Sequence, residues 1–597
     1  MDKRFFLTIA LCFLAAYVWM QFVVEPQARR GQDQTTQNQA TQQPAPHTPP
    51  TSGQVPNPVN NSGQPVGNQP NGVSAPAVNT APPPPTFPDI TSSLSNELVD
   101  IEISSMGATL TRMVLKAYKN EDLEQSLDLL SPERMSGKAL GLHFDGSHGV
   151  PWDVDNVPWQ LESSNEAEQS LRYRLPLPDG RSIIKTLWLR AEEYVVDMNL
   201  EFVGNWPQHL EFSTYGPERL RHDKNSRGVV NQCVYGISDI NGRFAQAERR
   251  TVEKLDAPAT LNGVTWAGLE TNYFAFVLRP VADTAGKRVD KLIMRQTSTF
   301  DPEWAKSTAI EQGKQGIPFE VGFGGALVPG QVYSFEAFGG PKDRGVLAQY
   351  SETGFGELID YGSILGWLVW LFLLLLGFFH SITGSFGIAI IFLTVVVKVL
   401  LHPINKKNQG VMMRQQKKMA KIQPQMQELK EKHKNDSMKA NREIQKLLKE
   451  NDVNPAQMFG GCLLMLLQLP IWIALINTFS LAIDLRQESF LYITDLTLPD
   501  RLFALPGGGF SFIMDFHHLN LLPFLYVIMT LISQRMMPRS SDPQMQQQQK
   551  MMTFMMVAFG FIFYNFSSGL LLYFMTSAAL GIVEQKIIRA ELKAEGL

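Results

Sequence analysis

The sequence predicts a polytopic α-helical membrane protein that carries a large all-β domain outside the membrane. Three observations support this fold class. Long apolar runs dominate the chain after residue 364, short alternating runs with turn residues fill the region from about 94 to 341, and a Pro/Gln-rich segment precedes them. The 597 residues suffice for several domains. The three cysteines are far apart and give neither a disulfide framework nor a zinc-binding spacing.

The N-terminal residues 1–25 are expected to form a transmembrane signal anchor. Three residues that include Lys3 and Arg4 precede an apolar run of about 20 residues, which is long enough to cross a bilayer. A cleaved signal peptide is the alternative, although no small-x-small site closes the run. The positive-inside rule then places the N-terminus in the cytoplasm and the following residues outside.

The segment 26–93 is expected to be a disordered linker outside the membrane. Between Pro26 and Pro88 it holds 15 prolines and a single aromatic residue, Phe87. Such a composition buries too little apolar surface to offset the entropy lost on ordering.

Residues 94–345 are expected to form the all-β domain. Apolar and polar residues alternate over 99–103, 185–189, 194–202 and 319–323, and turn residues such as Gly180 and Gly330 separate the runs. Many short strands with turns between them favour a sandwich or barrel. We find no metal-ligand spacing, nucleophile elbow or phosphate loop, so we expect an interaction domain without metal or cofactor; a sugar-binding or sugar-processing domain is the alternative.

Charge indicates which apolar runs cross the membrane. Candidates within 386–597 are five runs, at 386–401, 459–483, 519–532, 551–566 and 570–588. The segment 405–457 holds 13 Lys and Arg against 6 Asp and Glu, so it is expected in the cytoplasm together with the C-terminus. Only one crossing can then separate it from the β domain. We therefore expect residues 361–380 to form an amphipathic helix in the outer interface, which leaves six spans in all.

Lys398 lies inside the first core run, where a charge at mid-bilayer costs roughly 3 kcal/mol. It precedes Asn405 by seven residues, about 10 Å along a helix, so its ammonium could snorkel to the headgroups. The other interpretation is a water-filled cavity open to the cytoplasm. Polar residues in the spans favour the cavity, because such groups usually face a bundle interior or water: Thr394, Gln468, Asn477, Thr478, Asn565, Ser567, Ser568, Thr576, Ser577, Glu584 and Gln585.

The segment 405–457 is predicted to be a cytoplasmic helical hairpin. Met412, Met419 and Met426 recur every seven residues, and Ile422 and Leu429 follow with an offset of three, which is typical of a coiled-coil seam. A polar break at 432–437 separates this helix from a second one. The hairpin is either a solvated connector or a docking surface for a polyanionic or nascent-chain partner.

Several motifs are specific enough to carry a resemblance. They are VNPAQMFGGCLLMLLQLPIW at 453–472, DPQMQ at 542–546 with KMMTFM at 550–555, and FSSGLLLYF at 566–574. Weaker ones in the β domain are GLETNYFA at 268–275 and AFGGPK at 337–342. With these motifs the chain resembles the YidC/Oxa family of membrane protein insertases, in its Gram-negative form with a large periplasmic domain.

The resemblance implies a five-helix core around a hydrophilic groove that opens to the cytoplasm and the lipid. In the family a positive residue of the first core helix, usually Arg, attracts polar or acidic regions of an incoming chain, and Lys398 matches it without the donor fork of Arg. Thr394 and Gln468 match groove-lining positions. Tyr573 and Phe574 match an aromatic pair that contacts substrate. The outer domain resembles the family's β-supersandwich, which is similar to sugar-mutarotase folds.

The expected function is therefore that of an insertase and chaperone, and not of an enzyme. It would insert and help fold integral membrane proteins in the bacterial inner membrane, alone or with the Sec translocon. Expected partners are nascent membrane proteins, membrane lipids, the Sec translocon and the ribosome, the last through cytoplasmic loops and without readout of nucleic-acid sequence. The alternatives are a small-solute transporter or channel, which internal repeats would favour, and an envelope enzyme acting through the β domain.

Overall fold

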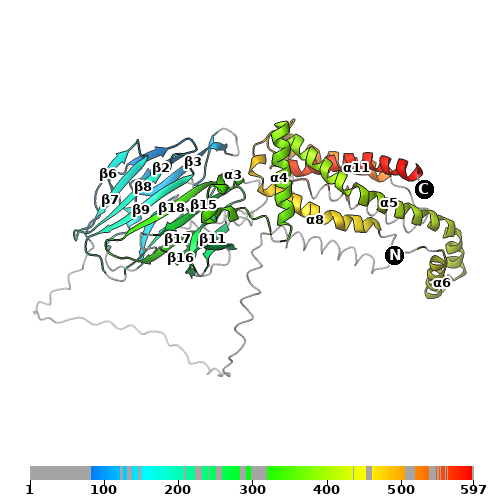
Figure 1. Cartoon of the computed structure of the whole chain (residues 1–597), viewed down its shortest axis with the longest axis horizontal. Helices are drawn as coiled ribbons and strands as arrows, with labels where there is room; N and C mark the ends of the chain where they lie inside the picture. Colours follow the sequence, from blue (N-terminus) through cyan, green and yellow to red (C-terminus); the bar gives the residue numbers. More distant parts are fainter. Residues whose placement is uncertain are drawn as a thin grey trace, which may run out of the picture.

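The computed structural model describes residues 82–594 with gaps, in two parts that follow one another along the chain (Figure 1). The β domain contains strands β1 to β18, and the helical part contains helices α4 to α11. The predicted anchor at 1–25 and residues 26–81 of the predicted linker lie outside the described residues. Shorter gaps occur throughout, and the longer ones are 131–137, 222–231, 251–258, 283–288, 297–318, 454–459, 505–517 and 537–545.

Three antiparallel sheets make up the β domain. The largest has nine strands in the order β12-β11-β14-β15-β18-β9-β8-β7-β6, the second has five in the order β13-β16-β17-β10-β5, and the third has four in the order β1-β2-β3-β4. Strands β14 and β15 of the first sheet pack against β17 of the second. The domain is thus all-β with sheets packed face to face, as the alternating runs predict.

The strands have the following bounds: β1 Thr91–Ser95, β2 Val99–Ser104, β3 Thr109–Lys119, β4 Ser126–Asp128, β5 Gly141–Asp145, β6 Gln160–Asn165, β7 Ser170–Pro176, β8 Ser182–Leu189, β9 Val195–Val203, β10 Glu211–Tyr215, β11 Gln232–Ser238, β12 Phe244–Arg250, β13 Ala259–Leu261, β14 Val264–Glu270, β15 Phe274–Val281, β16 Lys291–Gln296, β17 Phe319–Ala326 and β18 Val332–Pro341.

The four runs that alternate in sequence are strands β2, β8, β9 and β17. In β2 buried and half-exposed residues alternate without exception, so the period of two in the sequence corresponds to an inner and an outer face. The predicted turns are also present: Gly180 between β7 and β8 and Gly330 between β17 and β18 have φ of 85° and 79°. A positive φ of this kind favours glycine, which explains the residue at both turns.

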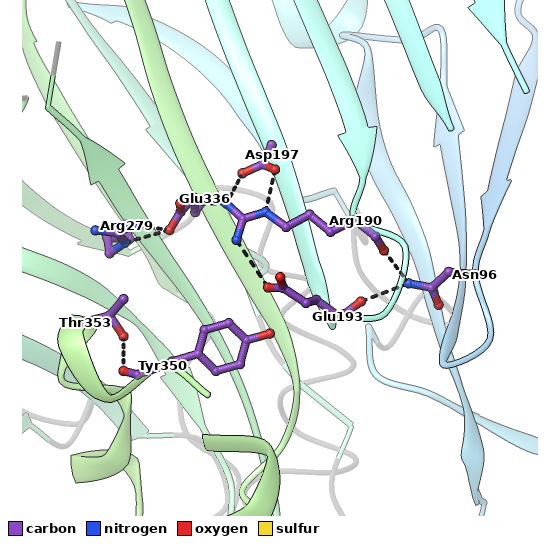
Figure 2. Close-up of polar contacts among 8 residues, drawn as sticks. All are labelled: Asn96, Arg190, Glu193, Asp197, Arg279, Glu336, Tyr350 and Thr353. Atoms are coloured by element: carbon purple, nitrogen blue, oxygen red, sulfur yellow. Dashed lines mark hydrogen bonds and ion pairs between the residues drawn. The ribbon is translucent and has the colours of Figure 1, made fainter. Parts of the chain in front are cut away.

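A ladder of charged side chains crosses the nine-stranded sheet (Figure 2). The register pairs Arg279 with Glu336 and Glu336 with Asp197. Arg190 binds the Asp197 carboxylate through two hydrogen bonds of 2.7 and 2.8 Å, and it donates to Glu336 at 2.6 Å. Tyr350 points toward this ladder (Figure 2). Because these charges satisfy one another, the ladder stabilises the sheet and does not indicate a catalytic group.

Of the four histidines singled out in the β domain, the structure describes one. His143 lies in β5, whereas His148, His209 and His222 lie outside the described residues. In the portion of the chain that the structure describes, no group of three or more His, Cys, Asp or Glu side chains could hold a metal ion.

The connection from the β domain to the helical part is fastened to the sheet. It contains α3 (Arg344–Ala348) and two 3-10 turns, η4 (Ser351–Thr353) and η5 (Phe355–Leu358). Arg249 of β12 donates to the backbone oxygens of Glu357 and Leu358 at 2.7 and 3.2 Å, and to the buried carboxylate of Glu270 at 2.7 Å. Lys342 donates to the same carboxylate at 2.9 Å, so two cations share one buried anion where β18 ends.

The helical part contains six described helices with the following bounds: α4 Gly366–Thr383, α5 Phe386–Lys432, α6 Ser437–Glu450, α8 Gly460–Leu481, α9 Leu521–Met536 and α11 Ser568–Ala594. By length and composition α4, α5 and α11 could each cross a membrane, and the apolar stretches Gln468–Leu481 and Leu521–Met536 are shorter. The predicted span at 551–566 is described only in part.

Helix α5 differs from the prediction in its length. The predicted span at 386–401 and the first arm of the predicted hairpin form one continuous helix of 47 residues, which is about 70 Å long. Pro403 and Pro424 lie inside it. A proline removes one backbone hydrogen bond but does not end a helix that neighbouring helices support.

Helix α4 runs across the helical part, whereas α5, α8 and α11 run along it (Figure 1). It packs against α5 and α8 through a buried stripe of Val369, Phe372 and Leu376. Its other side is exposed, with Trp367 at 66%.

The predicted seam of the hairpin is present between α5 and α6 from Met419 onward, whereas Met412 is not part of the cluster. Met419, Ile422 and Met426 of α5 are buried against Ile444 and Leu448 of α6, and Val453 completes the cluster. Asp436 accepts a hydrogen bond from the backbone N–H of Lys439 at 3.0 Å and so caps α6. The hairpin lies at the end of the helical part that is remote from the β domain (Figure 1).

A short segment after α8 docks on the β domain. It contains the 3-10 turn η6 (Ile483–Leu485), and the Ile483 side chain joins the hydrophobic core of the β domain. Arg486 donates to the backbone oxygen of Lys119 at 2.8 Å and lies over the ring of Phe274 at 5.5 Å. Gln487 donates to the same oxygen at 2.7 Å. The end of β3 therefore rests on the loop that joins α8 to α9.

Candidate functional site: an ion-paired lysine in the helical core

Lys398 lies opposite an acidic residue of the last helix. Its Nζ is 3.8 Å from Oε2 of Glu584, which α11 supplies. The two side chains are 23% and 12% exposed, so this ion pair lies largely inside the protein. Each charge partly offsets the free-energy cost of burying the other, so Lys398 is not an isolated charge in an apolar helix.

Two further side chains of α5 contact the Glu584 carboxylate. Asn405 Nδ2 donates to Oε1 at 2.8 Å, and His402 Nδ1 lies 3.4 Å from the same oxygen. Lys398, His402 and Asn405 follow one another at intervals of four and three residues, which places them on one face of a helix. We call these four residues, Glu584 included, the polar layer.

A glycine of α11 lies beside the Lys398 ammonium where α5 and α11 face each other. A Cβ at Gly581, one turn before Glu584, would lie 3.7 Å from Nζ of Lys398. The Lys398 side chain thus occupies space that a large residue at 581 would fill. Toward the hairpin, Lys406 and Glu591 form a second pair between the same helices at 3.0 Å.

Three other predicted site residues, Gln468, Tyr573 and Phe574, lie in a separate, tightly packed layer. The Phe574 ring contacts the rings of Trp472, Tyr526 and Phe563 at centroid distances of 5.7, 5.9 and 5.1 Å. Tyr573 is buried beside Gln468 without a hydrogen bond of normal geometry. We call Gln468, Trp472, Tyr526, Phe563, Tyr573 and Phe574 the aromatic layer. Tyr573 and Glu584 are eleven positions apart on α11, so the two layers are about 16 Å apart along the helix.

Thr394 is fully buried one turn before Lys398. Its hydroxyl donates to the backbone oxygen of Ile390 at 2.7 Å, so its hydrogen bond stays within α5. A buried threonine in a helix commonly makes this bond. The structure therefore brings Gln468, Tyr573 and Phe574 together, keeps Thr394 inside the packed core, and places Lys398 in the polar layer.

Sequence reasoning found Glu584 as a polar residue of the last span but missed its role as the partner of Lys398. Two signals point to it. The residue carries the opposite charge, and it lies four positions before Ile588, where the apolar run ends, which is close to the depth of Lys398. Two buried opposite charges at similar depth in one helical bundle are expected to meet.

Two family models match adjoining parts of the chain. The model described as the 60Kd inner membrane protein matches residues 378–595, and the model described as the YidC periplasmic domain matches residues 91–375. The division between the two models falls within α4. The helical part therefore lies in the inner membrane and the β domain in the periplasm.

Curated relatives agree with both models over most of the chain. The membrane protein insertase YidC of Syntrophus aciditrophicus is 28% identical over 514 residues, which cover 84% of this chain and 85% of the relative. The membrane protein insertase YidC of Maridesulfovibrio salexigens is 26% identical over 630 residues, which cover 99% of each chain. These relatives are named as insertases and not as enzymes.

Solved structures with a similar chain include an active YidC insertase with its first transmembrane domain resolved. It is 18% identical, covers 83% of this chain and 92% of its own, and has a TM-score of 0.34. YidC from Thermotoga maritima is 13% identical, with coverages of 83% and 99% and a TM-score of 0.28. A galactose mutarotase-like protein from Lactobacillus casei is 9% identical, with coverages of 42% and 99% and a TM-score of 0.27.

The matches to the periplasmic and the membrane model adjoin one another in the order of the described domains, and the similarity to the Maridesulfovibrio salexigens relative extends over both. They agree with the motifs at 453–472 and 566–574. The chain belongs to the YidC family of membrane protein insertases.

Proposed function

We propose that this chain inserts newly made membrane proteins into the inner membrane along a polar path that begins at Lys398. The observation that carries the proposal is the polar layer. Lys398, His402, Asn405 and Glu584 place two charges and two polar groups between α5 and α11, near the end of the apolar stretch of each helix. Intramembrane ionisable residues that pair with one another commonly mark a transport pathway.

A polar path lowers the main barrier to insertion. A client's polar tail must give up its water to cross lipid, and each unsatisfied polar group costs several kcal/mol there, on the order of 2–7 kcal/mol. Lys398 would attract an acidic tail near the cytoplasmic edge and so supply a partner during the crossing. The client's apolar segment would then leave sideways into lipid, with the membrane potential assisting acidic tails.

The aromatic layer acts as the closed end of this path. Tyr573 and Phe574 are buried among other aromatic rings, and Thr394 is fully buried. A client reaches these residues and Gln468 when the helices separate around it. The layer thereby keeps the periplasmic side sealed while no client is bound.

The arrangement supports six spans with both termini in the cytoplasm. The hairpin α5–α6 lies away from the periplasmic β domain, and α4 runs across the helices near that domain (Figure 1). This orientation of α4, with tryptophans on its exposed side, suits a helix in the outer interface. The anchor at 1–25 supplies the sixth span.

The hairpin is the proposed contact for cytoplasmic partners. Its seam buries apolar residues, which leaves basic side chains such as Lys418, Lys421 and Lys439 exposed on its surface. A basic surface of this kind suits the ribosome, which would deliver the nascent chain. For larger clients the Sec translocon would work beside the helical part.

The test is insertion by the purified full chain in proteoliposomes. The client is a short single-span protein with an acidic tail, and protease protection of the tail scores insertion. Wild type is expected to insert it, whereas Lys398→Ala and Lys398→Glu are expected to lose most insertion. Lys593→Glu, which changes an exposed lysine near the end of α11, is the matched control and should retain it.

The outcomes separate the alternatives. Insertion that survives in both Lys398 variants would show that the lysine only snorkels to the headgroups. Failure of the wild-type chain to insert the client would contradict the proposed function in this minimal system.

A further inference from the structure

The two carboxylate oxygens of Glu584 have contacts of unequal length, and this difference suggests a role for the residue. Its Oε1 takes a normal hydrogen bond from Asn405 at 2.8 Å, but its Oε2 is 3.8 Å from Lys398 Nζ, which is beyond hydrogen-bonding distance. Glu584 is therefore held in place by Asn405, with His402 nearby, and not by the lysine. Lys398 can exchange its partner without releasing Glu584 from α5.

A client carboxylate could form the contact that Glu584 does not. An ammonium and a carboxylate in direct contact are about 2.7–2.9 Å apart, and such charge-assisted bonds are roughly twice as strong as neutral ones. The lysine side chain is 23% exposed, so it is accessible to an incoming group, and Gly581 leaves it room to move. The resident pair is thus weak enough to be replaced.

We propose that Glu584 is the resident counter-ion of Lys398 and competes with acidic client tails, so that it sets how strongly the insertase prefers acidic over neutral tails. This inference rests on the proposed function. Before a client arrives, Glu584 offsets the burial cost of the lysine. When the tail arrives, the lysine transfers to the tail carboxylate while Asn405 keeps Glu584 aside. Only tails with enough negative charge effectively replace Glu584 as the partner of Lys398.

The experiment compares two clients that differ only in tail charge, with Asp or Asn at the same positions. The readout is the ratio of acidic-tail to neutral-tail insertion in proteoliposomes of the full chain. Glu584→Gln keeps an oxygen that can accept the Asn405 hydrogen bond but removes the competing charge. The ratio is expected to rise roughly tenfold, equivalent to 1.4 kcal/mol.

Glu591→Gln is the matched control, because it removes a carboxylate from the same helix that pairs with Lys406 and not with Lys398. Its ratio is expected to equal that of wild type. A wild-type ratio in Glu584→Gln, with insertion intact, would overturn the inference and leave the proposed function standing. If wild type inserts neither client, the proposed function fails and the inference fails with it.

A second pair of variants covers the case in which Glu584→Gln does not fold. In Lys398→Gln the remaining Glu584 should repel acidic tails, and in Lys398→Gln with Glu584→Gln this repulsion is absent. The ratio is therefore expected to be higher in the double variant than in the single one. Equal ratios in these two variants would contradict the competition.

Discussion

At the scale of single residues, Asp128 of β4 gives the β domain a measurable dependence on pH. Burial raises the pKa of this carboxyl to about 6, although the backbone N–H of Met113 and the guanidinium of Arg112 both favour its charged form. The folded state therefore binds a proton more tightly than the unfolded state. Stability from this group is fully present below pH 3.8 and is lost as the pH rises through about 6.

Replacing Asp128 with Asn removes this titration and keeps the shape of the side chain. Relative to wild type, the free energy of unfolding of Asp128→Asn is expected to increase by about 2–3 kcal/mol between pH 4 and pH 7, since one pKa unit corresponds to 1.36 kcal/mol. Hydrogen exchange of the β2 to β4 amides, compared at equal pH in the full chain in micelles, measures the difference. A difference that does not change with pH would contradict the shift.

The ion pair of Lys398 could be predicted from the sequence only in part. The cost of a charge in an apolar helix predicts that Lys398 has a partner or water. The choice of Glu584 among the polar residues of the spans depends on how α5 and α11 pack, and Gly581 is part of that packing. Sequence periodicity describes each helix alone, so it cannot supply the facing surface.

At the scale of elements, the segment at Ile483 to Gln487 couples the membrane helices to the β domain. Arg486 is buried and makes both a backbone hydrogen bond to Lys119 and a contact with the Phe274 ring. The loop that contains it is acidic overall, so its composition predicts a periplasmic position but no docking site. The docking depends on where the end of β3 lies in the folded protein, which the composition of the loop does not specify.

Arg486→Ala is expected to weaken this docking by about 1–3 kcal/mol, because a charged hydrogen bond and a cation–π contact are both lost. Faster hydrogen exchange in the segment after α8 and at the end of β3 would report it. Arg501→Ala, which removes a charge from the same loop, is the control and should leave exchange at β3 unchanged. Unchanged exchange in Arg486→Ala would show that Ile483 and Gln487 suffice to hold the contact.

Helix α5 continues through a proline that the sequence pattern places at the end of a span. Its sequence contains the pair His402-Pro403, which predicts the end of a span, yet the helix continues to Lys432. Contacts to α11 lie on both sides of this proline, at Lys398, Asn405 and Lys406. Tertiary packing thus outweighs the local preference, which a sequence pattern cannot weigh.

At the scale of the whole molecule, the polar contacts described above fall separately into the two parts. The polar and aromatic layers contain only residues of the helical part. In the β domain, the charge ladder stabilises the nine-stranded sheet, and the buried Glu270 carboxylate with Arg249 and Lys342 stabilises the connection to α4. The alternation of residues predicted the all-β class, but the strand order of the three sheets required non-local pairing that no run contains.

A chain that lacks β1 to β18 but keeps the anchor and the linker is therefore expected to retain insertion of the short acidic-tailed client. The proteoliposome assay measures this, with protein amounts matched by immunoblot. Complete loss of insertion by a well-incorporated variant would show that the periplasmic domain takes part in the transfer itself, and it would favour a function that depends on that domain.

A polar path between α5 and α11 is tested by a photoreactive residue at Ser577, which shares a face of α11 with Gly581 and Glu584. A matched probe replaces Val583, which is exposed on another face. The acidic tail of a stalled client is expected to crosslink to the Ser577 probe and much less to the Val583 probe, and Lys398→Ala is expected to abolish the Ser577 crosslink. Crosslinks of equal strength at both positions, unaffected by Lys398→Ala, would contradict a polar path between α5 and α11.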